Sequence, residues 1–434
     1  MSAAAASKIS TAGTNSAAGV AVQPAEARET PAPAAGAEGF APPAPSRTPR
    51  LLRQVQVVAA LVVALVAALG VWAVLDLRAD VASAPSVVDQ YVRVGQIEHG
   101  LIEAGNQATL AVINTETASG SHATASLAQL AEVSRLLVAA AQARPSDGPQ
   151  LQELAADVMA YSQQLGGVTG VTKAQSTARL ATADEELTQL RASLAQLKGE
   201  LERDATAGSW AQNLVWMVVA GLVALAVLAW LSWLVAQHTH RVLNLGLVAA
   251  LVAVLVVVGF VVAAQGSAGT AGELARGTEL RRMVNVADGT TQLAVARQVQ
   301  LRAVLQQDWG KAKQIDYSTA FTAASAAADN DDALPTLSGF KDAHAKLADQ
   351  LSKPDWPAAA KLLLDDADGS LTAAATRFDD AAARTSTEAV QATADATAQA
   401  QRELIVPLLG IIVVGALGAL FGVLGLAQRI KEYL

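Results

Sequence analysis

Three short clusters of side chains in this chain of 434 residues have the types that bind metal ions. His238 and His240, in "HTH", point apart on a helix or turn, and no Cys, Asp or Glu completes a set of four ligands. "DNDD", Asp329–Asp332, gathers carboxylates of the kind that Ca²⁺ prefers, but lacks the glycine and distal glutamate of an EF-hand loop. "DDAD", Asp365–Asp368, is weaker, because the pattern around it predicts a helix. We therefore expect no bound metal and no other cofactor.

No catalytic motif accompanies these clusters. The sequence has no GxGxxG, P-loop, GxSxG or HExxH motif in its expected context. It has no cysteine, which excludes disulfides and thiol chemistry. The net charge of −8 argues against a nucleic-acid partner, because phosphate binding needs a basic surface. These observations predict a binding or relay protein rather than an enzyme.

Four apolar runs decide the fold class. Hydrophobic residues make up 52% of the chain and charged residues only 16%, against a usual charged share of about 25%. Each run is long enough to cross a hydrocarbon core of ~30 Å as a helix and to contact membrane lipid. We predict an all-α membrane protein with four transmembrane helices. No charged residue lies well inside a span, which disfavours a transporter or pump.

The spans divide the chain into one plan that occurs twice: a span, an outer domain and a second span. Basic residues before the first span, in the turn after the second and behind the fourth place both termini in the cytoplasm and both long segments outside. The Ala/Pro-rich start is predicted to be disordered. The predicted parts are a cytoplasmic arm (1–50), span 1 (51–77), extracytoplasmic domain 1 (78–209), span 2 (210–235), a cytoplasmic turn (236–241), span 3 (242–264), extracytoplasmic domain 2 (265–403), span 4 (404–427) and a cytoplasmic tail (428–434).

Each extracytoplasmic domain has the composition of a helical bundle, rich in Ala, Leu, Gln, Asp and Lys with little β-branched alternation. Turn signals divide each domain into four helical stretches. Both domains are therefore predicted to be four-helix-bundle-like, with first and last helices that continue the adjoining spans. The turn signals are Pro85, Gly120, "RPSDGP" and "GGVTG" in the first domain, and "DWGK", "DNDDALP" and "KPDWP" in the second.

A leucine seam runs toward the second span in "LATADEELTQLRASLAQLKGEL". Its leucines alternate at spacings of three and four, which is typical of one buried face of a helix. Two compatible interpretations follow: a signalling helix that continues into the membrane, or one wall of a bundle core. The leucines are Leu180, Leu187, Leu190, Leu194, Leu197 and Leu201.

Aromatic residues and glycines suggest further contacts. The tryptophans near the ends of span 2 are typical of an aromatic belt. Trp309 and Trp356 instead lie at turns of the second domain, where they either contact a partner or cap the bundle ends. Gly418 and Gly422, in "GALFG", permit close helix contact within one protomer or between two protomers of a homodimer.

Three short patches carry a family resemblance. The tail "RIKEYL" has a basic residue before Glu432 and Tyr433, "ARQVQLRAVLQQDWGKAKQIDYSTAF" (Ala296–Phe321) joins an Ala-Arg helix to a helix with Tyr and Phe, and Tyr161 lies in the third helical stretch. With the four-span plan, these patches resemble the actinobacterial GlnX-type membrane proteins. The bundle layout also resembles chemoreceptor sensory domains.

The GlnX-type resemblance implies amino-acid sensing by a non-enzymatic signal relay. A solute-binding lipoprotein for glutamate or aspartate would act outside and a serine/threonine kinase of the G type inside, with Tyr161 among the outer contacts. Candidate docking residues on the cytoplasmic face are Arg241, Arg429, Lys431, Glu432 and Tyr433, whose alternative role is to anchor the topology. Two other functions remain open: a scaffold of the cell envelope, and a transporter component.

Overall fold

The computed structural model describes residues 48–114, 119–206, 210–239, 245–330, 334–335, 337–365 and 367–432. Every element in these ranges is a helix, and none of the described residues forms a strand, which confirms the all-α prediction. The predicted N-terminal arm up to residue 47 lies outside the described residues.

The helices follow one another with short connections. The α-helices are α1 (Thr48–Ile113), α2 (Ser119–Ala143), α3 (Gly148–Gly166), α4 (Lys173–Thr206), α5 (Trp210–Thr239), α6 (Leu245–Glu273), α7 (Leu280–Gln306), α8 (Lys311–Asp329), α9 (Ser338–Ser352), α10 (Trp356–Leu363), α11 (Leu371–Glu403) and α12 (Ile405–Glu432). A 3₁₀ turn, η1 (Pro145–Asp147), precedes α3, and a π-helix, η2 (Leu274–Glu279), joins α6 to α7.

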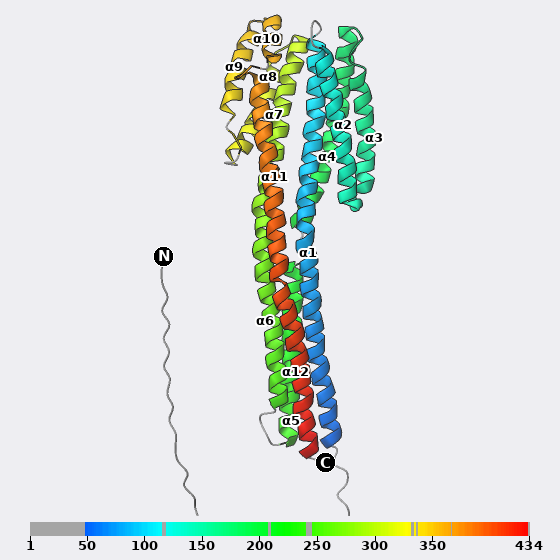
Figure 1. Cartoon of the computed structure of the whole chain (residues 1–434), viewed down its shortest axis with the longest axis vertical. Coiled ribbons are helices and arrows are strands. Elements are labelled where there is room, and N and C mark those ends of the chain that lie inside the picture. The colour runs from blue at the N-terminus through cyan, green and yellow to red at the C-terminus, as the bar shows by residue number, and fades with distance from the viewer. Residues whose placement is uncertain are drawn as a thin grey trace, which may run out of the picture. The chain divides into compact units, whose positions relative to one another are not determined.

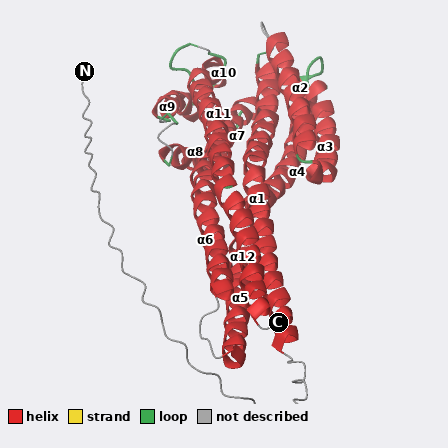
Figure 2. Ribbon diagram, turned by 60° about the horizontal axis from the view of Figure 1, so that its bottom comes forward, coloured by secondary structure: helices red, strands yellow, loops and turns green. Residues whose placement is uncertain are grey.

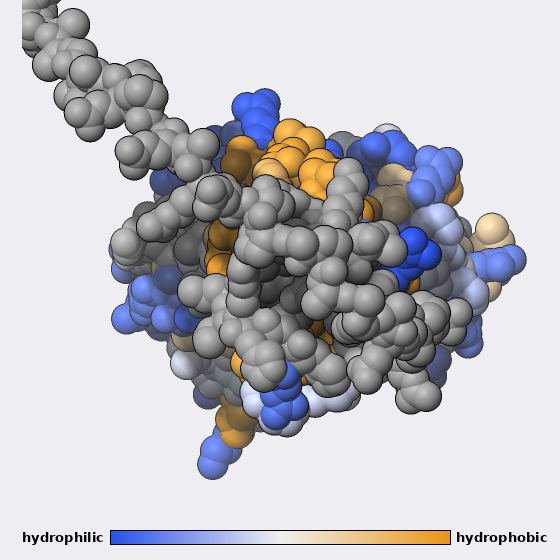
Figure 3. Space-filling view, turned by 90° about the horizontal axis from the view of Figure 1, so that it is seen from below, coloured by the Kyte–Doolittle hydropathy of each residue, from blue (hydrophilic) through white to orange (hydrophobic). Residues whose placement is uncertain are grey.

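Four helical segments are long and apolar enough to cross a membrane, in agreement with the four predicted spans. The segments are Arg53–Ile113, Val215–Gln237, Leu245–Gly269 and Leu371–Gly425. α1, α5, α6 and α12 pack side by side (Figure 1) around a core that includes Val63, Leu228, Val257 and Ile411. Apolar side chains also remain on the outer surface of the molecule, as the view from below shows (Figure 3).

α1 is one uninterrupted helix of 66 residues, so its apolar run continues directly into the polar part of the molecule. The sequence predicts a break at Pro85, and this prediction is wrong, because Pro85 lies inside α1. A proline removes one backbone donor and commonly kinks a helix. Here the Ser83 and Ser86 hydroxyls donate to carbonyls in this turn at 2.7 and 2.6 Å, and buried valines on both sides hold the helix in its packing.

The outer half of α1 (residues 78–113) forms a four-helix arrangement with α2, α3 and α4, here named the N-terminal group. α1 packs against α2 and α4, and α3 packs against the same two helices. "RPSDGP" and "GGVTG" lie at the turns on either side of α3, as predicted. Tyr91, Leu101, Tyr161 and Leu190 are among the fully buried side chains of its core.

Helices α7 to α11 form the C-terminal group, which has five helices among the described residues instead of the four predicted stretches. α7 packs against α8 and α11, and α9 packs against α10 and α11. The core contains Leu301, Tyr317, Phe340 and Phe378.

The fifth helix arises because the "DDAD" region is a loop. The sequence predicts a helix there, and this prediction is wrong: α10 ends at Leu363 and α11 begins at Leu371. Gly369 has a φ of 87°, a conformation that favours glycine. The Ser370 side chain then accepts a hydrogen bond of 3.1 Å from the backbone N–H of Ala373, which is a helix N-cap.

The two groups pack against each other, and Arg47–Leu434 form one compact unit. The core of the N-terminal group includes Met283, Ala287 and Ala294 from α7 and Ala389 from α11. At Gly95 the backbones approach so closely that an added Cβ would lie 2.9 Å from the Cβ of Ala287. Figure 2 shows α1 and α7 side by side along this junction.

Small residues set the packing of α12 against α1 and α6. A Cβ added to Gly418 would clash with Ala253 of α6, and one added to Gly425 would lie 2.7 Å from the Cα of Gly246. Gly422 has nothing within 4 Å of an added Cβ. Of the two glycines in the predicted packing motif, Gly418 therefore makes a close contact, and it makes it inside one chain.

Helical backbone continues from the membrane-type helices into both groups. α1 does so without interruption, η2 joins α6 directly to α7, and only Leu404 separates α11 from α12. Leu404 donates to Ala400 and accepts from Leu408, so the hydrogen-bond ladder runs through this junction. The predicted continuation of the leucine seam from α4 into α5 falls on residues 207–209, which lie outside the described residues.

Candidate functional site: the polar junction between the helix groups

A buried carboxylate ties α1 to α4 inside the N-terminal group. The Glu98 side chain is 9% exposed and pairs with Lys198 at 2.6 Å and with Arg191 at 3.0 Å. Burial alone would raise the pKa of Glu98, but the two cations bring that pKa below its ordinary value. Glu98 is therefore held as a carboxylate, fixed by partners that lie about two turns apart on α4.

A second buried pair crosses from one group to the other. Arg297 of α7 lies 3.1 Å from a carboxylate oxygen of Glu103 on α1, and the two side chains are 8% and 13% exposed. The Arg297 guanidinium also donates to the Thr372 hydroxyl of α11 at 3.3 Å. Next to this pair, the Asn106 amide donates to the Ala294 carbonyl of α7 at 3.2 Å. These contacts fix α1, α7 and α11 at one register.

A third contact joins α4 to α7 on another side of the junction. Arg302 lies 2.7 Å from the Asp184 carboxylate, and the Gln298 amide donates to the same oxygen at 2.9 Å. Both arginine and carboxylate line a cavity of about 300 Å³ together with Arg191 and Lys313. Nε and Nη1 of Arg302 are buried and have no hydrogen-bond partner among the described residues.

We name the three contacts centred on Glu98, Glu103 and Asp184 the polar junction. Burying charges costs desolvation free energy, so such pairs are weak sources of stability, yet removing one partner is strongly destabilising. Their best-attested use is to fix the register of packed helices. The junction can thus hold α1, α4, α7 and α11 in one discrete arrangement.

An aromatic cluster surrounds Trp309, one of the predicted outer contacts. Its ring centroid lies 6.2 Å from those of Tyr317 and His344, and the latter two rings stack at 3.7 Å. Burial lowers the pKa of His344 to about 4 and raises that of Tyr317. Nδ1 of His344 lies 2.6 Å from the amide nitrogen of the fully buried Gln300. Trp309 is partly buried in this cluster, which fits its alternative role as an end cap.

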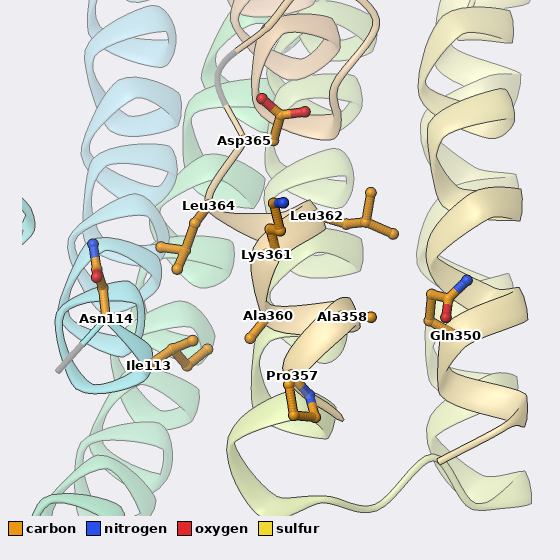
Figure 4. A pocket seen from close by; sticks show the side chains of 10 residues that line it. All are labelled: Ile113, Asn114, Gln350, Pro357, Ala358, Ala360, Lys361, Leu362, Leu364 and Asp365. Carbon is orange, nitrogen blue, oxygen red and sulfur yellow. The ribbon is translucent and has the colours of Figure 1, made fainter. Parts of the chain in front are cut away.

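Trp356, the second predicted contact, begins α10 and also packs partly buried on the core of the C-terminal group. Beside it, an open pocket of about 920 Å³ lies between the end of α1, α9 and α10. Figure 4 shows its lining, with the aliphatic Ile113, Leu362 and Leu364 and the charged Lys361 among the labelled side chains.

Tyr161, the third predicted contact, is a core residue. Its side chain is buried and its hydroxyl donates to the Leu101 carbonyl of α1 at 3.0 Å. Burial raises the pKa of Tyr161, so it stays protonated as a donor. In this arrangement it packs α3 against α1 and presents no surface to a partner.

The leucine seam also faces the core. All six leucines are buried, with exposures of 5% or less, in the cluster shared by α1 to α4. This is the bundle-wall interpretation; whether the seam also transmits a signal stays a prediction.

The predicted cytoplasmic docking residues fall at the limits of the described chain. Arg241 and Tyr433 lie outside the described residues. Arg429, Lys431 and Glu432 belong to the last turns of α12, and the structure describes only their helical backbone. The described residues hold no group of three or more His, Cys, Asp or Glu that could bind a metal ion.

Sequence reasoning missed the polar junction. Glu98 occupies a position in the apolar repeat of α1, between the buried Val94 and Leu101, at the spacings that predict a core position. A charge inside such a repeat is a signal of a buried pair, and the sequence shows that charge. It does not show that Lys198 or Arg297 supplies the partner, because those residues are distant in sequence.

Comparisons with models of protein families, with curated proteins and with solved structures gave no match. The functional argument therefore rests on the geometry of the helices and on the polar junction.

Proposed function

We propose that the protein is a non-enzymatic transmembrane signal relay, in which an input at the helix groups biases the arrangement of the membrane helices. The observation that supports this proposal most directly is α1. It is a single helix that contributes to both the core of the membrane-type helices and the core of the N-terminal group. A helix held in two cores moves as one element, so a shift at one end reaches the other.

The polar junction gives such a relay its discrete states. The buried ion pairs form at one register of α1 against α7. Intermediate registers are destabilised, because they leave a buried charge without its partner. An input that shifts this register must make different contacts in the two arrangements. The proposal thus locates the switch at Glu103, Arg297 and their neighbours.

The proposal also covers the orientation of the chain in the membrane and its partners on the two sides. The helix groups would be extracytoplasmic, both termini cytoplasmic, and the spans would lie in the cell membrane. The GlnX-type resemblance supplies the partners: a solute-binding lipoprotein for glutamate or aspartate outside and a serine/threonine kinase inside. The kinase would dock on Arg241 and the tail.

The test is the phosphorylation state of the kinase's substrate in cells given external glutamate or aspartate, with and without this protein. The response should vanish on deletion and return with the intact gene. Gly95→Val, which forces α1 away from Ala287, should change the response, and Gly199→Val should not, because an added Cβ there meets only Arg203 at 3.9 Å. A response that persists on deletion would overturn the relay and favour a scaffold of the envelope.

A proline substitution in α4 tests whether the leucine seam or α1 carries the signal. Ser193→Pro should break α4 in its interior, since proline there costs ~3 kcal/mol or more. With membrane levels matched by immunoblot, a response that survives this substitution excludes α4 as the signalling helix and leaves α1.

A further inference from the structure

A cavity of about 360 Å³ lies between the two helix groups, outside the polar junction. α1 and α2 line it from the N-terminal group, and α7 and α11 line it from the C-terminal group. Much of its wall is apolar, from Val133 and Leu136 of α2 and Met283 and Val286 of α7. Its volume is within the range of small-molecule sites, at the lower end.

Two polar side chains, Asp379 and His99, lie in the wall of this cavity. Asp379 of α11 faces His99 of α1, with Oδ2 and Nε2 at 3.8 Å, which is too long for a hydrogen bond. Asp379 Oδ1 and His99 Nδ1 are buried, and neither has a hydrogen-bond partner among the described residues. Because Oδ1 is inaccessible, Oδ2 is the oxygen through which the partly exposed Asp379 side chain can meet a ligand, and it accepts no hydrogen bond from the described residues.

Apart from His99, Asp379 has no cation in direct contact among the described residues: Arg297 favours its ionised form from a distance, and the carboxylates of Glu103 and Asp380 oppose it. The other charged residues that line the cavity are Glu132 and Arg135 of α2, which pair with each other. α7 lines the cavity with Thr290 and apolar residues, and α1 adds one amide (Gln96), one valine, two glycines and His99. Burial, with the carboxylates of Glu103 and Asp380, raises the pKa of Asp379 to about 6, so near pH 7 this carboxylate is ionised, and its side chain is 34% exposed. The cavity thus favours one positive charge.

We propose that this cavity binds a small organic amine, with the ammonium group donating to the Asp379 carboxylate and the hydrocarbon body packed among Val133, Leu136, Met283 and Val286. A metal ion fits poorly, because Ca²⁺ takes six to eight oxygen ligands and the described residues hold no metal-binding cluster. An anion would meet the Asp379 carboxylate without an unpaired cation to oppose it.

Such a site would be an input of the relay, and this role rests on the proposed function. The ligand would touch α1, α7 and α11, the three elements of the cavity that continue into membrane-type helices. Binding itself does not depend on the relay and can be measured on the purified protein.

The binding experiment uses the full chain in lipid nanodiscs, with empty nanodiscs subtracted, and isothermal titration with 2-phenylethylamine. The neutral 2-phenylethanol and the anionic 3-phenylpropionate are the matched analogues. The amine should bind at least ten-fold more tightly than either. Absence of amine binding, or equal binding of the alcohol, would overturn the proposal.

Asp379→Asn should weaken amine binding at least ten-fold, and Asp380→Asn, which removes the neighbouring exposed carboxylate, should leave it nearly unchanged. Equal affinities in the two variants would contradict the proposed contact. If Asp379→Asn fails to fold, the unmodified protein still decides the point, because amine affinity should fall as the pH drops below about 6. Amine binding without any effect of Asp379→Asn on the cellular response would retain the site and reject its role as the relay's input.

Discussion

The two ends of the molecule pack their helices by different means. Among the membrane-type helices, close approach depends on the absence of side chains, as at Gly418 against Ala253 and at Gly425 against Gly246. In the helix groups, α1 is held by charged partners, with Glu98 on Lys198 and Glu103 on Arg297. Shape tolerates gradual shifts, whereas a buried ion pair is either made or broken. From this difference we expect the polar junction to select between discrete arrangements of α1, and the membrane-type helices to adjust to the arrangement that is selected.

Arg297→Ala should have the largest effect, because it leaves Glu103 buried without its cation. Breaking a buried pair costs roughly 3–5 kcal/mol, measured as a loss of thermal stability of the full chain in nanodiscs. Arg135→Ala removes a cation from an exposed, solvent-screened pair and should change stability little. Equal losses of stability in the two variants would contradict the inference that the buried pairs of the polar junction hold α1 in place.

Leu190→Ala tests whether the stability of the N-terminal group also depends on the burial of apolar side chains. Leu190 is fully buried, so its truncation should cost roughly 2–5 kcal/mol in the same unfolding measurement. Leu127, which is 55% exposed, provides the matched Leu→Ala control and should change stability by less than about 0.5 kcal/mol. A small effect at Leu190 would contradict the packing of the leucine seam in the core.

Gly418→Ala tests packing by shape at the membrane end. The new methyl group clashes with Ala253 of α6, and overpacking of this kind costs roughly 1–3 kcal/mol. Gly422→Ala, in the same motif, meets no atom within 4 Å and should be near neutral. The two variants are compared by their thermal stability in nanodiscs. If Gly422→Ala lowers stability more than Gly418→Ala, the close contact lies elsewhere, as in a homodimer.

The last prediction concerns pH and the C-terminal group, and its effect develops only below neutral pH. His344 has a folded pKa of about 4, below its unfolded value near 6.5, because burial disfavours the charged ring. Its contribution to stability is therefore present above pH 6.5 and is lost as the pH falls toward 4, on the order of 1 kcal/mol per pKa unit. His344→Gln should flatten that part of the stability profile, and an unchanged slope would exclude His344 as its source.

Much of the fold follows from local sequence patterns. The four apolar runs, the turns "RPSDGP" and "GGVTG" and the leucine seam each depend on neighbouring residues, and all appear in the structure. Two local predictions are wrong for identifiable reasons. Proline at 85 is accommodated by packing inside α1, and Gly369 with the Ser370 cap breaks a helix that composition favoured.

The candidate sites are different, because their parts meet only in three dimensions. By itself the sequence determined an all-helical chain with four membrane-type segments, since hydropathy and helical periodicity are local properties. Only the tertiary structure decided that Glu103 faces Arg297 and that Asp379 faces His99, pairs separated by about 200 residues or more. A charge inside an apolar repeat indicates that an oppositely charged partner exists. Which residue is that partner depends on which helices pack together and at what register.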